Sequence, residues 1–146
     1  MGCSETRSEK TKDEAKKFSF NNQFTMYGAI QGNQIIVVLS LIDNGFLIDL
    51  KMPSFTMKSS LHIAAEFGRD IILKELIARK GDINSQDSYG LTPIFYAVKN
   101  RHVEIAKTLD KYGADLSIVS SQGFTIKDYI PKGKKKNFPS FFKKVR

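Results

Sequence analysis

The sequence predicts an all-α fold, a solenoid of stacked helix-turn-helix units joined by short β-turn loops. The main observation is a repeat: the segment that begins at Leu61 recurs at Ile94, an offset of 33 residues. The second observation is that apolar residues in each unit follow helical spacing in two short segments with a break between them. Units of this size bury a core only against their neighbours, so we expect about three of them plus a half-repeat cap.

Each element of the unit has a residue-level reason. The paired small residues Ala64 and Ala65 in the first helix favour close helix packing, and Gly68 breaks the chain before the second helix. We assign the chain reversal after the second helix to Gly81 in one unit and to Gly113 in the next. The loop that follows contains a turn, residues 87–90. It leads to Thr92-Pro93, which predict a helix cap and a first helical turn.

These residues resemble the ankyrin repeat, through Gly90-Leu-Thr-Pro-Ile-Phe-Tyr-Ala and Lys111-Tyr-Gly-Ala-Asp-Leu. The resemblance covers roughly residues 24–130 and is specific because several motif positions fall in register. The unit that contains Ser59-Ser-Leu-His62 departs from the motif, because it lacks Thr-Pro and has Met57 where the turn glycine is usual. The next unit has Phe95 in place of the usual histidine and Arg101 in place of the usual glycine.

The first and last units are incomplete versions of the pattern. Gly32 and Gly45 of the first unit lie 36 residues before Gly68 and Gly81, so we expect the loop through Pro53 to be about three residues longer than standard. After residue 123 the pattern runs only to residue 130, which predicts the half-repeat cap. We therefore divide the chain into a flexible tether (1–18), an ankyrin-like repeat domain (19–130) and a basic aromatic tail (131–146).

The charge of the chain is concentrated at its end. The net charge of the 146 residues is +8, yet residues 18–130 carry eleven basic and eleven acidic side chains, whereas residues 131–146 carry seven basic side chains and no acidic one. A nucleic-acid-binding fold normally places its cations on a structured face. This distribution argues against nucleic acid as a partner and favours an anionic surface.

The N-terminal residues match the pattern for lipid attachment. Met1-Gly2-Cys3-Ser4-Glu5-Thr6 fits N-myristoylation at Gly2, and Cys3 is placed for palmitoylation. One myristoyl chain binds a bilayer only marginally, so stable anchoring needs a second chain or a polybasic patch, and both candidates are present. Residues 5–17 contain no large apolar side chain and predict a flexible spacer or a solvated helix capped at Thr11. We expect a lipid-anchored protein at the cytoplasmic face of a membrane.

The tail has several interpretations, which remain open. Its cations and phenylalanines favour contact with an anionic membrane, and its composition is similar to effector segments that calmodulin releases from membranes. The segment after Pro139 also has helical spacing that predicts a last helix covering the end of the stack. The basic run that begins at Lys132 is in addition compatible with nuclear import. The tail residues proposed for membrane or polyanion contact are Lys132, Lys134, Lys135, Lys136, Phe138, Phe141, Phe142, Lys143, Lys144 and Arg146.

The sequence predicts no catalytic, metal or cofactor site. His62 and His102 lack the cysteine, serine or paired carboxylate neighbours that nucleophilic or metal chemistry needs. The resemblance implies that His62 bonds to a neighbouring loop. The longest apolar run, residues 35–42, is shorter than the roughly 18 residues that a membrane-spanning helix needs.

The resemblance implies a protein-binding groove along the turn tips and the exposed sides of the first helices. The candidate contact residues are Phe55, Lys58, Glu66, Phe67, Ser88, Tyr89, Leu91, Lys99, Asn100, Ser121, Gln122 and Phe124. Our leading hypothesis is a non-enzymatic adaptor, tethered to a membrane by N-terminal acylation, that presents this groove to an unknown protein partner. The alternative is a soluble ankyrin-type regulator that its tail directs to the nucleus or to polyanions.

Overall fold

A computed structural model describes residues 22–52 and 54–133 of the chain. All regular structure in these two ranges is helical, which confirms the predicted all-α repeat fold. A first helix covers residues 22–31. It is followed by α2 (Ile35–Asp43), α3 (Ser60–Glu66), α4 (Asp70–Ala78), α5 (Pro93–Lys99), α6 (Val103–Lys111) and the 3-10 helix η1 (Ile126–Tyr129).

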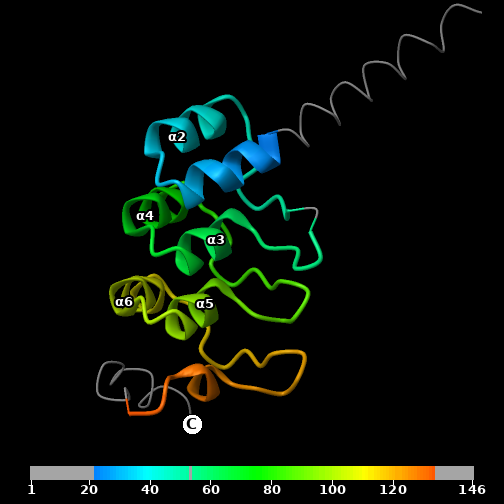
Figure 1. Cartoon of the computed structure of the whole chain (residues 1–146), viewed down its shortest axis with the longest axis vertical. Helices are drawn as coiled ribbons and strands as arrows, with labels where there is room; N and C mark the ends of the chain where they lie inside the picture. The colour runs from blue at the N-terminus through cyan, green and yellow to red at the C-terminus, as the bar shows by residue number, and fades with distance from the viewer. Residues whose placement is uncertain (1–21, 53, 134–146) are drawn as a thin grey trace, which may run out of the picture.

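The helices stack in two columns with the loops on one side (Figure 1). The helix over residues 22–31, α3, α5 and η1 form the inner column, beside the loops, and α2, α4 and α6 form the outer column. The inner helix α3 packs against α4 and α5, and α5 packs against α6 and η1. The described residues therefore contain three helix pairs and a half repeat, as the repeat pattern predicted.

Local chemistry fixes where the inner helices begin. Ser59 precedes α3 in an extended conformation and forms a capping box with His62. Thr92 has the same extended conformation before α5, and Pro93 occupies the first turn, where its missing N–H has no helical partner to lose. The inner helices α3 and α5 end two residues before the left-handed positions Gly68 and Arg101, with φ angles of +73° and +64°.

One assignment from the sequence was wrong at the ends of the outer helices. The left-handed residues there are Gly45, Lys80 and Gly113, with φ angles of +89°, +64° and +94°, so Lys80 and not Gly81 reverses the chain after α4. Gly81 is needed for space instead. A Cβ atom on Gly81 would lie 3.0 Å from both the Ile48 side chain and a backbone carbonyl oxygen.

The length of the first loop also differs from the expectation. The left-handed residue that ends the first helix is Asn33 rather than Gly32. Asn33 precedes Gly68 by 35 residues, whereas Gly68 precedes Arg101 by 33, so the loop through residue 53 is two residues longer than the next one, not three. Asparagine adopts the left-handed conformation more readily than most residues, which is why the neighbouring glycine was misleading.

The core runs through the middle of the stack. Fully or almost fully buried side chains come from every helix pair, namely Met26, Ile30, Val38, Leu61, Ile72, Leu73, Leu76, Ile94, Phe95 and Leu109. Polar bonds then join one repeat to the next. The Ser88 N–H donates to the Thr56 carbonyl (3.0 Å), and His102 Nε2 donates to the Glu66 carbonyl (3.1 Å). Such hydrogen bonds fix the position of each loop and inner helix relative to those of the adjacent repeat.

Candidate functional site

The predicted binding surface lies where the loop tips meet the inner column, and we call it the groove. Most of the predicted side chains are exposed there: Phe55, Ser88, Tyr89, Lys99, Asn100, Ser121, Gln122 and Phe124. Lys58, Glu66 and Phe67 are half-buried. Leu91 is only 6% exposed, so most of its side chain belongs to the core, although it also lines one of the hollows described below.

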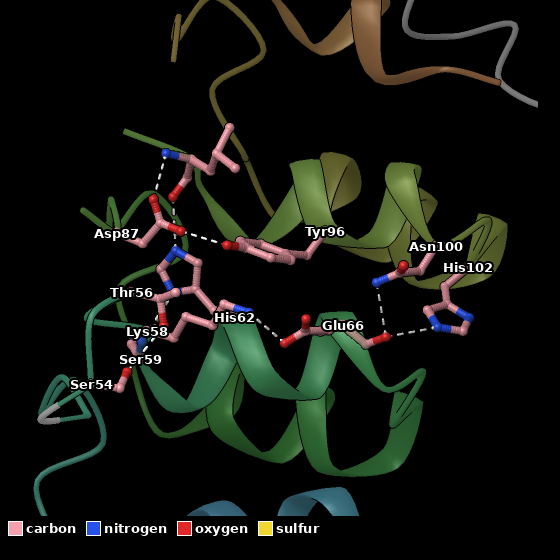
Figure 2. Close-up of polar contacts among 11 residues, drawn as sticks. Ser54, Thr56, Lys58, Ser59, His62, Glu66, Asp87, Tyr96, Asn100 and His102 are labelled. Atoms are coloured by element: carbon pink, nitrogen blue, oxygen red, sulfur yellow. Dashed lines mark hydrogen bonds and ion pairs between the residues drawn. The ribbon is translucent and has the colours of Figure 1, made fainter. Parts of the chain in front are cut away.

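A polar cluster crosses the middle of the groove (Figure 2). Lys58 Nζ lies 2.8 Å from Glu66 Oε2 and 4.3 Å from the centroid of the Tyr96 ring. An ammonium group in this position interacts with the carboxylate and with the π face together. Asn100 Nδ2 also donates to the Glu66 carbonyl at 3.1 Å, which links α3 to the end of α5.

The loop that carries Tyr89 is tied to α5 through a buried carboxylate. The Tyr96 hydroxyl donates to Asp87 Oδ2 at 2.6 Å, and Asp87 Oδ1 accepts the N–H groups of Tyr89 (2.8 Å) and Leu91 (2.9 Å). Burial, and then the bond to Asp87, raise the pKa of Tyr96 well above its usual value. Sequence reasoning missed this pair. The available signal was an acidic residue at a turn with a tyrosine nine positions later.

His62 joins two successive repeats, as the family resemblance implied. His62 Nε2 donates to the Leu91 carbonyl (2.9 Å), and Nδ1 accepts the Ser59 N–H (3.1 Å) and hydroxyl (2.8 Å). This arrangement requires the neutral ring, and burial lowers the pKa of His62 more than the bond to Leu91 and the charge of Asp87 raise it. Because both Ser59 and His62 are fully buried, no substrate reaches this serine–histidine pair.

Two hollows lie along the groove. The first has a volume of about 260 Å³ and a mainly apolar lining, made by Phe24, Tyr27, Met52, Ser54, Thr56 and Lys58. The second has a volume of about 310 Å³ and a mixed lining, made by Tyr89, Leu91, Tyr96, Lys99, Ser120, Gln122 and Tyr129. Tyr27, Met52, Ser120 and Tyr129 were not among the residues predicted from the sequence. They reach the groove because adjacent repeats bring the loops together.

Several predicted residues lie outside the described part of the chain. These are the lipidation candidates Gly2 and Cys3 and the tail residues from 134 to 146. Lys132 is described and exposed. Within residues 22–52 and 54–133, no helix has the length and apolar character needed to cross a bilayer, and no cluster of three potential metal ligands is present.

The family model for ankyrin repeats, in three copies, matches residues 19–120. An ankyrin repeat protein of Rickettsia bellii is 39% identical over 93 residues, which are 60% of this chain and 55% of that protein. An ankyrin repeat-containing protein of Schizosaccharomyces pombe is 35% identical over 88 residues, 60% of this chain and 40% of that protein.

A third relative is the palmitoyltransferase AKR1 of Lachancea kluyveri, 33% identical over 101 residues, 67% of this chain and 14% of that protein. The chain thus spans about half the length of the Rickettsia relative and a smaller part of the other two. The match to the family model covers most of the chain and includes the three helix pairs described above. The chain therefore belongs to the ankyrin-repeat family.

Proposed function

We propose that this chain is a non-enzymatic adaptor that binds a protein partner in its groove and is held at the cytoplasmic face of a membrane by lipids on Gly2 and Cys3. Ankyrin repeats are protein-binding modules, and the observation that supports groove binding is a row of exposed aromatic side chains at the loop tips. Phe55, Tyr89 and Phe124 are 97%, 48% and 46% exposed, respectively. Aromatic side chains of this kind are frequent anchors in protein interfaces.

The polar groups of the groove support a binding role rather than catalysis. The buried His62 and Asp87 are both committed to structural hydrogen bonds, and the Lys58 ammonium is paired with Glu66. The name of the palmitoyltransferase relative carries no activity to this chain, because the chain corresponds to 14% of that protein. We therefore assign the repeats a recognition function.

Support for the membrane tether comes from the sequence of the N-terminus. Gly2 and Thr6 occupy the positions that N-myristoylation requires, and Cys3 is the sole cysteine of the chain. The basic tail supplies further attraction to anionic lipids, about 1 kcal/mol for each cation near the surface. Calmodulin is a candidate second partner, for the tail.

Metabolic labelling with myristate and palmitate analogues tests the tether. Wild type is expected to incorporate both labels and to pellet with membranes, Gly2→Ala is expected to lose both labels, and Cys3→Ser is expected to lose palmitate alone. An unlabelled, soluble wild-type protein contradicts the tether. If nuclear localisation is then lost when Lys134, Lys135 and Lys136 are changed to Gln, the soluble nuclear regulator is the correct function.

Proximity labelling in cells tests the groove. We expect the wild type to label some proteins that the Tyr89→Ala variant does not label. Tyr89 is exposed at a loop tip, so its loss removes a contact residue and leaves the core intact. Ser40→Ala, an exposed change on the outer helix α2, is the matched control and is expected to label the wild-type set. An identical set of labelled proteins for wild type and Tyr89→Ala contradicts binding at this face.

A further inference from the structure

The second hollow is rich in hydrogen-bond donors that the described part of the chain does not use. Lys99 is exposed there and has no ion pair or hydrogen bond among the described residues, and the hydroxyls of Tyr89 and Tyr129 have none either. The Ser120 oxygen accepts the Phe124 N–H at 3.0 Å, which leaves the Ser120 proton available. These groups belong to residues that line one space, and the single formal charge among those residues is positive.

Asp87 and Glu66, two acidic residues of the groove, are bonded to partners other than Lys99. Asp87 accepts three hydrogen bonds, from Tyr96 and from two backbone N–H groups. Glu66, the residue equivalent to Lys99 in the preceding repeat, is bound to Lys58 at 2.8 Å. No carboxylate lines the second hollow, so Lys99 has no counterion among the residues that line it.

The first hollow differs from the second in chemistry. Its lining is mainly apolar, from Phe24, Tyr27 and Met52, and its one cation is the paired Lys58. The two hollows lie two repeats apart, because the first is beside the helix over residues 22–31 and the second is between α5 and η1. Neighbouring helices pack about 8–10 Å apart, so the separation is roughly 16–20 Å. An extended peptide covers that distance in about five or six residues.

We infer that the groove binds an acidic peptide segment of its protein partner, with an Asp or Glu carboxylate at Lys99 in the second hollow and an apolar side chain in the first hollow. This inference rests on the proposed groove-binding function and adds the chemistry of the partner. The carboxylate forms an ion pair with the Lys99 ammonium and accepts hydrogen bonds from the free hydroxyl groups around it. The apolar side chain displaces water from the first hollow.

Selection from a phage library of random peptides against the full-length chain tests this inference. Wild type is expected to enrich peptides that carry Asp or Glu about five or six residues from a large apolar residue. Lys99→Ala is expected to weaken the selected peptides about five-fold, measured by fluorescence polarisation at low salt. Lys99→Glu is expected to enrich basic peptides instead, because it reverses the charge of the hollow.

Lys111→Glu is the matched control, because Lys111 is exposed on the outer helix α6 and the charge change is identical. It is expected to select the same peptides as wild type. Two results overturn the acidic partner and leave groove binding in place. In the first, the selected peptides need Tyr89 for binding but contain no Asp or Glu. In the second, they need Tyr89 but bind the Lys99→Ala variant as tightly as the wild type. Failure to select any peptide whose binding depends on Tyr89 overturns both.

Discussion

Ser59 and Thr92 occupy the same position in successive repeats, yet their hydroxyl groups differ in bonding. The Ser59 hydroxyl lies 2.8 Å from His62 Nδ1, whereas Thr92 Oγ1 is buried and has no partner among the described residues. The reason is Phe95, which replaces the histidine in the second of these repeats. A buried hydroxyl without a partner costs about 1–3 kcal/mol of desolvation.

Replacing Thr92 by valine is therefore expected to raise the free energy of unfolding by about 1 kcal/mol. Valine keeps the shape of threonine and removes the unpaired oxygen, and Thr92 makes no side-chain capping bond that would be lost. Ser59→Ala is the matched control and is expected to lower the free energy of unfolding by about 1 kcal/mol. Urea denaturation measures both values, and a loss of stability in Thr92→Val contradicts the explanation.

The neutral His62 ring makes stability depend on pH. Burial lowers the pKa of His62 below its ordinary value of 6.5, so the unfolded chain binds a proton at a pH where the folded chain does not. The stabilisation is present above pH 6.5 and is lost as the pH falls below that value toward the lowered pKa of the folded state. We expect the urea concentration at the unfolding midpoint to fall as the pH is lowered from 7.5 to 5.

A histidine variant identifies the source of this pH dependence. His62→Phe is expected to make the urea midpoint nearly independent of pH over the same range. The variant is expected to fold, since Phe95 shows that the fold accepts phenylalanine at this position. His102→Gln changes the other histidine of the chain and is expected to keep the dependence. The same slope in wild type and in His62→Phe rules out His62 as its origin.

At the level of residues, the sequence predicted bonds that the repeat motif specifies and missed those peculiar to this chain. The bond from His62 to the next loop was predictable because the motif supplies both groups in register. The Asp87–Tyr96 bond was not, because it depends on the side chains of a turn and a helix that the motif leaves variable. The burial of Leu91 was not predictable for a similar reason, since its repeat equivalent Lys58 is half-buried while Leu91 is buried.

The ends of the outer helices α4 and α6 allow a direct test of backbone strain. Lys80 and Gly113 occupy the same left-handed position, with φ angles of +64° and +94°, and a Cβ atom on Gly113 would meet no atom within 4 Å. Gly113→Ala is therefore expected to lower the free energy of unfolding by about 1 kcal/mol through conformation alone. Lys80→Gly is expected to raise it by about 0.5 kcal/mol, because relief of strain exceeds the added entropy of the unfolded chain.

Thermal denaturation of the two variants and the wild type measures these effects. Lys111→Ala, at the end of α6 but in helical conformation, is the control for changes at an exposed helix terminus and is expected to be nearly neutral. Shifts of the same sign for Gly113→Ala and Lys80→Gly contradict the role of backbone conformation.

Element types were therefore easier to predict than loop register. The helix pairs follow from apolar spacing, which the core enforces. The register of the first loop was misjudged because Gly32 and Gly81 were taken to mark left-handed positions, whereas Asn33 and Lys80 adopt that conformation here. The cost of about 1–2 kcal/mol for a non-glycine residue is small compared with the packing that holds each turn, so residue identity does not settle backbone conformation.

The groove belongs to the whole stack, and this limits what its sequence reveals. Its exposed aromatic tips were predictable from their place in each repeat. Its two hollows were not predictable, because each is lined by residues from different repeats. The volume and the charge of a hollow therefore do not follow from the sequence of a single repeat. The free cation at Lys99 became evident only once the partners of Lys58 and Asp87 were located.

Stability should also vary along the stack, because the first repeat has a neighbour on one side only among the described residues. Leu41 of α2 and Leu76 of α4 hold the same place in their repeats, but Leu76 is fully buried whereas Leu41 is half-buried. Leu76→Ala is expected to lower the free energy of unfolding by about 3 kcal/mol, within the usual range for a buried leucine. Leu41→Ala is expected to cost less than half as much, because part of its side chain already faces water.

Urea denaturation gives the two costs, and hydrogen exchange locates them. In the Leu41→Ala variant, increased exchange should be confined to the helix over residues 22–31 and α2, because each repeat contacts only its neighbours. In the Leu76→Ala variant, exchange should increase in α3, α5 and α6 as well, since α4 packs between the repeats on both sides. Equal costs for the two variants, with the same exchange pattern, contradict a gradient of stability and indicate that the described repeats unfold as one unit.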